Sequence, residues 1–200
     1  MESCIILCGG MSRRMGKDKG SMVFDKKPMI IHVLEAVENI ADEIIIVLRD
    51  EKQAEIYKKL LKSAEWGRKD MDLKICTDIM KDQGPLGGIL TGLTHSMSNK
   101  SLILPCDSPF IKESFVLKIF SFYEDNFDAV VPRWPTGDVE PLHAIYKKES
   151  TEKIEELLRN NMRNVKALIE RSKVKFVDAE LLDETGKSFQ NINRMKDIEQ

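Results

Sequence analysis

Short, strongly apolar runs alternate with segments of helical spacing along most of this chain. The run from 43 to 48 reads Glu-Ile-Ile-Ile-Val-Leu, which is too apolar to keep one face in water and is typical of a strand buried on both faces. The segment from 28 to 37 places apolar residues at positions 30, 33, 34 and 37, which is the spacing of a helix. This alternation favours parallel strands with helices on both faces. We therefore predict an α/β fold with a Rossmann-like, doubly wound and mostly parallel sheet.

The same two patterns assign the rest of the chain. On the helix expected over 51–64, we predict that Ile56, Leu60 and Leu61 face the core. No repeat or linker interrupts the 200 residues, a length that suits one core, so we expect a single domain over 1–200. Strands are predicted at 4–7, 43–48, 73–77, 101–105, 129–131, 142–146 and 174–178, and helices at 28–37, 51–64, 87–95, 112–123, 150–159 and 165–171.

The near-balanced net charge argues against a nucleic-acid-binding protein. The formal net charge is -2, whereas a nucleic-acid-binding domain is usually basic, so we expect no nucleic-acid partner. No run approaches the roughly 20 apolar residues of a membrane span, and the N-terminus has no basic segment followed by an apolar one. We therefore predict a cytoplasmic protein without a membrane partner. The four cysteines form no Cys-x-x-Cys pair and are predicted to be buried, reduced thiols.

Positive charge is concentrated just after the first predicted strand. Gly9 and Gly10 follow the apolar run 4–7 and free the backbone to approach a ligand closely. Four cationic side chains come next: Arg13, Arg14, Lys17 and Lys19. A glycine turn after a strand, crowded with positive charge, is typical of a polyphosphate site. The spacing excludes a P-loop, G-x-x-x-x-G-K-[ST], and also the dinucleotide fingerprint G-x-G-x-x-G.

Three candidate ligand-binding segments each come directly after a predicted strand: the Gly9-Gly10 turn, Asp78 and Asp107. Ligands of open α/β sheets bind beyond the carboxyl ends of the strands, so these segments are expected to converge on one edge. Asp107 lies between two prolines. Its carboxylate suits Mg²⁺, which typically takes one or two carboxylates plus substrate phosphates. The alternative is an aspartate that caps a turn.

The segment from Gly84 to Gly88, Gly-Pro-Leu-Gly-Gly, is predicted to be a second rigid loop that leads into a helix. Its glycines permit close approach of the backbone, whose groups can read a planar base. The alternative is a helix-start loop without a ligand. Asp78 precedes this segment, and a carboxylate can accept hydrogen bonds from the N1 and N2 donors of guanine or from ribose hydroxyls.

Residues 7–20 resemble the signature loop of the nucleotidyltransferases, L-A-G-G-x-S-x-R-M-G-x-D-K, with Cys8 in place of the usual alanine. The ending Asp18-Lys19-Gly20 is similar to that of the molybdenum cofactor guanylyltransferases, the MobA family. The resemblance continues in order through Asp78, the G-P-L-x-G segment at 84–88, the C-D-x-P motif at 106–109 and an N-x-N element at 191–193. It implies a fold of the nucleotide-diphospho-sugar transferase type.

Two departures from the family pattern are visible. Arg194-Met195 stands where relatives carry Thr-Pro after the N-x-N element, which puts the local turn in doubt. Arg49 stands after the second strand, where many relatives have a small polar residue near the nucleotide. An arginine there could bind a phosphate or merely face water.

The resemblance implies transfer of GMP from GTP to the terminal phosphate of molybdopterin, with Mg²⁺ as cofactor and pyrophosphate as product. Lys19 would stabilise the pentavalent phosphate, Arg14 would hold the departing pyrophosphate and Asp107 would position Mg²⁺. Asn191 and Asn193 would support the metal or the substrate, or else cap a final short helix. Transient contact with proteins that deliver or accept the cofactor is also implied. The residues expected to bind GTP are Leu7, Cys8, Gly9, Gly10, Lys19, Asp78, Gly84, Pro85, Leu86 and Asp107.

No Ser-His-Asp or Cys-His arrangement is apparent in the sequence, and His143 is predicted to be a packed or edge residue rather than a base. Nucleotidyl transfer needs no such dyad, because a terminal phosphate with a second pKa near ~6 is already nucleophilic at neutral pH. Three alternatives stay open: the same transfer from CTP, guanylyl transfer to another phosphorylated metabolite, and a non-catalytic nucleotide-sensing scaffold.

Overall fold

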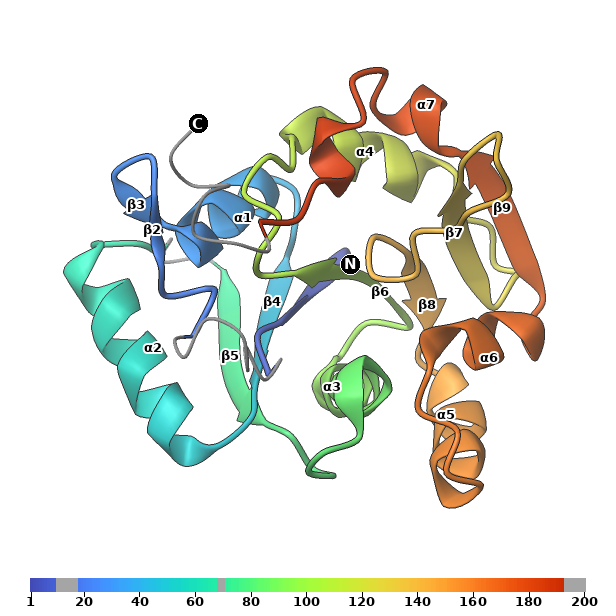
Figure 1. The fold of residues 1–200 in the computed structure, drawn as a ribbon, viewed down its shortest axis with the longest axis horizontal. Helices are drawn as coiled ribbons and strands as arrows, with labels where there is room; N and C mark the ends of the chain where they lie inside the picture. Colours follow the sequence, from blue (N-terminus) through green and yellow to red (C-terminus); the bar gives the residue numbers. More distant parts are fainter. Residues whose placement is uncertain (10–17, 68–70, 193–200) are drawn as a thin grey trace.

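A seven-stranded sheet forms the centre of the computed structural model, which describes residues 1–9, 18–67 and 71–192 (Figure 1). The strand order is β5-β4-β1-β6-β8-β7-β9. Four strands of the first half run parallel, and in their register Ile5 pairs with Ile45 and with Ile103. These strands are β1 (Ser3–Leu7), β4 (Glu43–Leu48), β5 (Asp72–Thr77) and β6 (Lys100–Pro105).

The second half of the sheet contains one reversal. β8 (Ile145–Lys147) runs antiparallel to both β6 and β7 (Ala129–Arg133), and β9 (Val174–Asp178) is parallel to β7 at the edge. A separate two-stranded hairpin, β2 (Val23–Phe24) with β3 (Lys27–Pro28), precedes the first helix. The predicted doubly wound, mostly parallel sheet is confirmed. Within it, β8 is the strand that runs antiparallel to its neighbours.

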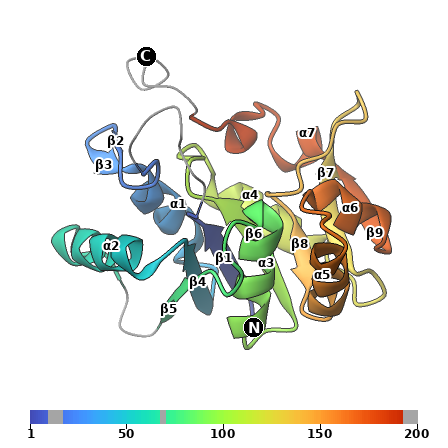
Figure 2. The ribbon, with the colours of Figure 1, turned by 60° about the horizontal axis from the view of Figure 1, so that its bottom comes forward.

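The helices cover both faces of the sheet because successive strand residues point to opposite sides. Ile44 and Ile46 pack in one apolar cluster with α1, α2, α4 and α7, whereas Ile45 and Val47 pack in another with α3, α5 and α6. Figures 1 and 2 show these two layers, with α3, α5 and α6 in front of the strands in Figure 2. The helices are α1 (Met29–Val37), α2 (Glu51–Ser63), α3 (Gly84–His95), α4 (Glu113–Ser121), α5 (Ser150–Arg159), α6 (Val165–Glu170) and α7 (Ala179–Leu182), with a 3-10 turn at Lys187–Phe189.

Three predictions about elements were wrong. The strand expected over 142–146 begins only at Ile145, because 141–143 form a turn. The segment from Gly84 is the first turn of α3 rather than a loop, and Pro85 stands in that first turn, where its missing N–H costs nothing. On α2 the side chain of Ile56 is 46% exposed, and Tyr57 is buried in its place.

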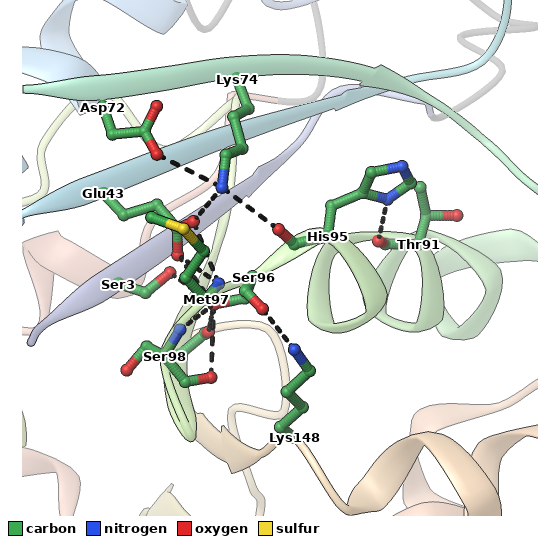
Figure 3. Close-up of polar contacts among 11 residues, drawn as sticks. Ser3, Glu43, Asp72, Lys74, Thr91, His95, Ser96, Met97, Ser98 and Lys148 are labelled. Atoms are coloured by element: carbon green, nitrogen blue, oxygen red, sulfur yellow. Dashed lines mark hydrogen bonds and ion pairs between the residues drawn. The ribbon is translucent and has the colours of Figure 1, made fainter.

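A buried carboxylate closes the amino-terminal edge of the sheet (Figure 3). Glu43, the first residue of β4, accepts hydrogen bonds from Lys74 Nζ at 2.6 Å and Ser96 Oγ at 2.8 Å, and also from the backbone N–H of Met97. These donors lower the pKa of Glu43 although burial alone would raise it. The network ties the carboxyl end of α3 to β4 and β5. No helix within the described ranges is both long and apolar enough to cross a membrane.

Candidate active site

A cavity of about 560 Å³ opens at the carboxyl ends of the parallel strands. The predicted convergence is confirmed, because residues that follow β1, β4, β5 and β6 all contribute to its wall. The start of α3 and the loop between α5 and α6 complete the wall. The lining residues are Leu7, Cys8, Gly9, Lys19, Val47, Arg49, Asp78, Asp82, Gly84, Pro85, Gly88, Pro105, Cys106, Asp107, Leu142 and Arg163.

Gly9 is the position where the backbone after β1 comes closest to the neighbouring strand end. A Cβ atom there would lie 3.1 Å from Asp78 Oδ2 and 3.6 Å from the backbone nitrogen of Arg49. A larger residue would press on the Asp78 side chain and require it to shift, so a glycine favours this close approach. The glycine therefore keeps the carboxylate of Asp78 and the first loop on the same wall of the cavity.

Asp78 carries the least satisfied carboxylate of the cavity wall. Its Oδ1 atom is buried and has no hydrogen-bond partner within the described part of the chain. Burial raises the pKa of Asp78 to about 6, an effect that a hydrogen bond with the Thr91 side chain only partly offsets. An unpaired buried acceptor is costly, so the position of this carboxylate lowers the stability of the fold.

Lys19 and Asp107, which also line the cavity, form an ion pair with Nζ 2.7 Å from Oδ2. Their side chains are 22% and 15% exposed, so both reach the cavity while remaining partly shielded from water. Asp107 follows the end of β6, and Lys19 ends the first loop. The sequence predicted both as site residues but not that they would contact each other.

A buried network holds the end of the first loop, and the sequence analysis missed it. Tyr57 Oη donates to Asp18 Oδ1 at 2.5 Å, and the Gln53 amide donates to the other oxygen of Asp18 and to the carbonyl oxygen of Cys8 at 2.9 Å. Gly20 packs so tightly here that a Cβ atom would lie 2.3 Å from Tyr57 Oη. This network fixes the residue that precedes Lys19. Gln53 and Tyr57 are 35 and 39 residues from Asp18 in sequence, so no local pattern reveals these contacts.

The first turn of α3 presents only part of the predicted Gly84 to Gly88 segment to the cavity. Gly84 adopts a positive φ of 64°, and Gly84, Pro85 and Gly88 line the wall. The side chain of Leu86 is fully buried in the apolar core and is absent from the cavity wall. The prediction that Leu86 contacts GTP therefore does not extend to its side chain.

Two arginines stand in the wall of the cavity. Arg49 lines it, and its Nε pairs with Asp50 at 2.9 Å while the side chain stays 42% exposed. Arg163, which the sequence analysis did not single out, comes from the loop before α6 and donates to the carbonyl oxygen of Asp82 at 3.3 Å. The cavity thus combines cationic and anionic groups, as a phosphorylated ligand with a polar base requires.

The Asn191 segment lies beside Asp107. The N–H of Ile192 donates to the Asp107 carbonyl oxygen at 2.8 Å, and Asn191 Oδ1 accepts from Ser108 Oγ. Ser108 Oγ also lies 3.3 Å from His143 Nε2, so the structure brings together a serine and a histidine that the sequence did not connect. Ser108 is 0% exposed and is not part of the cavity wall. His143 is buried and packed, as predicted. Gly10, Arg14 and Asn193 lie outside the described residues.

The cavity lies at the strand ends and has a lysine–aspartate pair and a closely packed glycine in its wall. This combination is typical of an α/β nucleotidyltransferase. The model of the MobA-like NTP transferase domain matches residues 4–176, and the chain belongs to this family of enzymes.

Relatives support this assignment over the full length of the chain. A probable molybdenum cofactor guanylyltransferase from Methanothermobacter thermautotrophicus is 37% identical over 99% of this chain and 98% of its own length. The molybdenum cofactor guanylyltransferase of Desulfosudis oleivorans is 31% identical over 98% of this chain and 91% of its own.

Solved structures give the same result. Molybdopterin-guanine dinucleotide biosynthesis protein A from Archaeoglobus fulgidus superposes with a TM-score of 0.80 at 27% identity, and the match covers 100% of this chain and 95% of that one. A 4-diphosphocytidyl-2C-methyl-D-erythritol synthase from Anaerococcus prevotii superposes with a TM-score of 0.72 at 18% identity, covering 98% and 94% of the two chains. The second likeness concerns the fold alone, and it agrees with the predicted nucleotide-diphospho-sugar transferase type.

Proposed function

We propose that this protein transfers GMP from GTP to the terminal phosphate of molybdopterin, forming the molybdopterin guanine dinucleotide and pyrophosphate. The relatives named above as guanylyltransferases support this activity. The observation that carries the proposal is one cavity that holds both the Lys19–Asp107 pair and the carboxylate of Asp78, whose Oδ1 atom has no partner among the described residues. The first would serve phosphoryl chemistry and the second would read the base.

In the proposed reaction, an oxygen of the acceptor's terminal phosphate attacks the α-phosphorus of GTP. A new phosphorus–oxygen bond forms, the bond to the bridging oxygen between the α and β phosphates breaks, and pyrophosphate leaves. The acceptor phosphate ionises with a second pKa near ~6, so no general base is needed. The protein must instead align the two substrates and offset the charge that builds on the α-phosphate. Lys19 is the described cation best placed for this role.

Guanine fits Asp78 better than cytosine does. An ionised carboxylate only accepts hydrogen bonds, and the adjacent N1–H and N2 amine of guanine offer two donors in the same direction. Cytosine offers a single amine donor, N4. Since the pKa of Asp78 is about 6, the carboxylate is ionised at neutral pH and ready to accept both bonds.

We assign Mg²⁺ as the metal that this enzyme requires. Mg²⁺ takes oxygen ligands and is commonly bound through one or two carboxylates together with substrate phosphates. The carboxylate of Asp107 reaches the cavity and fits this donor set. In the described residues no group of three or more His, Cys, Asp or Glu side chains could hold a metal, so Asp107 would act with the phosphates of GTP. The bound cation would neutralise phosphate charge.

The remaining assignments follow from the same reaction. One sheet runs through both halves of the chain, which supports a single domain over residues 1–200. The described cysteines are all free thiols, which suits the reducing cytoplasm, where we place the reaction. Transient contacts with proteins that supply molybdopterin and receive the dinucleotide remain predictions.

Pyrophosphate release tests the proposed function. Purified protein with Mg²⁺ and molybdopterin is expected to release pyrophosphate with GTP and not with CTP, and the product should contain guanine. Release with CTP alone would contradict the base assignment and keep the chemistry. Binding of GTP without release, by folded protein and in the presence of the acceptor, would indicate another phosphorylated acceptor or a nucleotide sensor.

A further inference from the structure

A chain of polar side chains runs through the interior from His143 to Asn191, with Glu140 nearby. Glu140 accepts from Trp134 Nε1 at 2.8 Å, and its other carboxylate oxygen lies 3.9 Å from His143 Nδ1. His143 Nε2 lies 3.3 Å from Ser108 Oγ, which in turn donates to Asn191 Oδ1. Three segments that are far apart in sequence therefore meet along one line of contacts.

The middle of this chain is enclosed by aromatic rings. His143 is 1% exposed and Ser108 is 0% exposed. The imidazole lies edge-on to Phe115 at 6.3 Å and to Phe189 at 5.3 Å between ring centroids. A polar group in such surroundings is stable only where its hydrogen bonds are made, so the enclosure holds the serine and the imidazole in one arrangement.

The available protons give the chain a direction. Burial lowers the pKa of His143 to about 3, so the imidazole is neutral and carries one N–H. Ser108 has a single proton and donates it to Asn191, so the imidazole proton must be on Nε2 in order to donate to Ser108. The Nδ1 atom is then an acceptor without a hydrogen-bond partner among the described residues, and the Glu140 carboxylate, 3.9 Å away, does not extend the chain.

The outer end of the chain lies beside Asp107, which lines the candidate active site, although Asn191 is not itself part of the cavity wall. Ser108 directly follows Asp107, and Ile192, which follows Asn191, donates its N–H to the Asp107 carbonyl oxygen at 2.8 Å. Leu142, which precedes His143, lines the cavity. Asn191 itself is exposed. With Oδ1 engaged by Ser108, the N–H groups of Nδ2 are the donors that Asn191 presents.

We propose that His143 and Ser108 are positioning residues that orient the Asn191 amide beside Asp107, so that its N–H groups bind the oxygen-rich, phosphorylated acceptor. This inference rests on the proposed function, since it assigns Asn191 to the acceptor rather than to GTP. Neither of the two positioning residues touches the substrate. Their effect reaches it through a single hydrogen bond at the end of the chain.

The first test is Ser108→Ala, which removes the bond to Asn191. The KM for molybdopterin is expected to rise about 5- to 10-fold, the cost of one hydrogen bond, while the KM for GTP and kcat change less than about twofold. The matched control is Ser150→Ala, because Ser150 is 2% exposed and its hydroxyl has no partner among the described residues. A loss of kcat, or an equal rise in both KM values, would overturn the proposal.

The histidine gives a second, independent test. His143→Gln keeps a side-chain N–H that can donate to Ser108 and is expected to retain the KM of the wild type within about threefold. His143→Phe fills the same aromatic enclosure without a donor and is expected to show the full rise in KM for molybdopterin. Equal effects of the two substitutions would contradict a hydrogen-bonded chain. This pair also carries the test if Ser108→Ala fails to fold.

A double-mutant cycle shows whether Ser108 acts through Asn191. In an Asn191→Ala background, Ser108→Ala is expected to change the KM for molybdopterin less than twofold, because the amide it positions is already gone. A purely structural role for Ser108 would give additive effects in the two backgrounds, and additivity would overturn the proposal.

One measurement does not depend on the reaction. Amide hydrogen exchange at Ile192 should be about 5-fold faster in Ser108→Ala than in Ser150→Ala, because the Asn191 segment loses its tie to Ser108. If the wild type releases no pyrophosphate, the proposed function fails while this exchange still tests the positioning. If the wild type turns over and Ser108→Ala changes neither exchange nor KM, the positioning alone fails.

Discussion

Two buried or half-buried carboxylates lie at opposite ends of the strands of the central sheet. They differ in how many of their hydrogen bonds are made. Glu43 begins β4 at the amino-terminal edge, and Asp78 follows β5 at the carboxyl-terminal edge. Glu43 is 0% exposed and accepts from a lysine, a serine and a backbone N–H, which lower its pKa. Asp78 has a buried oxygen without a partner among the described residues, and its pKa is raised to about 6.

From this difference we infer that Glu43 serves stability and that Asp78 serves a ligand. Folding tolerates a buried carboxylate when donors surround it, and Glu43 has them. An unsatisfied carboxylate costs stability, and we propose that a bound molecule supplies the donors that Asp78 lacks. The comparison concerns these two carboxylates, because Lys19 and Asp107 on the same cavity wall already pair with each other.

The largest effect is expected from removing Lys19, the lysine of the cavity wall. Lys19→Ala is expected to lower kcat/KM by about 10²- to 10³-fold, because a positioned charge that stabilises the transition state is lost. Lys27→Ala is the control, since Lys27 is 50% exposed and pairs with Glu35 on the surface. Steady-state pyrophosphate release measures both, and wild-type activity of Lys19→Ala would contradict the assigned site.

Removing Glu43 should cost stability and leave the chemistry intact. Glu43→Ala leaves Ser96, Met97 and part of Lys74 without their acceptor, and we expect a loss of about 2–4 kcal/mol in the free energy of unfolding. Chemical denaturation measures this loss, and kcat of the folded fraction should stay within twofold of the wild type. Because its folded pKa is lowered, Glu43 stabilises the fold above its ordinary value of 4.5 and loses this effect as the pH falls below it. A stable but inactive variant would reverse the roles of the two edges.

Asp78→Asn should have the opposite effects to Glu43→Ala: weaker substrate binding and a more stable fold. The affinity for GTP is expected to fall about 10- to 100-fold, because the ligand's donors lose a charged acceptor. The ligand-free protein should become more stable by about 1 kcal/mol at pH 8, after allowance for solvent screening, because an ionised carboxylate is no longer held in a site that raises its pKa. Calorimetry and thermal unfolding measure the two effects, and a destabilised variant with normal GTP affinity would contradict the comparison.

The smallest predicted effect is a pH dependence at the same residue. Since the pKa of Asp78 is raised to about 6 in the folded protein, its ionisation destabilises the ligand-free fold progressively as the pH rises from about 4 to above 6. GTP, which prefers the ionised form, should bind more weakly as the pH falls through about 6. The affinity of Asp78→Asn should be nearly constant over the same range. A wild-type affinity that rises below pH 6 would show that the carboxylate does not accept from the ligand.

The position of the candidate site at the carboxyl ends of the strands could be predicted from sequence. The strand pairing in the second half of the chain could not. Apolar runs and helical spacing are local patterns, and ligand sites follow the carboxyl ends of parallel strands, so Gly9, Asp78 and Asp107 were placed together correctly. The antiparallel course of β8 depends on which neighbours its short strand finds, which no local pattern encodes.

The same limit explains the polar contacts that the sequence did not reveal. Ser108 meets a histidine 35 residues away and an asparagine 83 residues away. Helical spacing also did not identify the buried face of α2 correctly. Tyr57 rather than Ile56 is buried, and its hydroxyl donates to Asp18. Periodicity identifies which residues are apolar, but the partners of buried polar groups emerge only from the folded chain.

The most direct test of the account is a calorimetric titration of GTP and of CTP, each with Mg²⁺, into the wild type and into Asp78→Asn at pH 7.5. We predict that the wild type binds GTP at least about 10-fold more tightly than CTP, and that Asp78→Asn removes this preference by weakening GTP alone. Equal affinity of the two proteins for GTP would contradict the claim that the unpaired carboxylate at this edge reads the base.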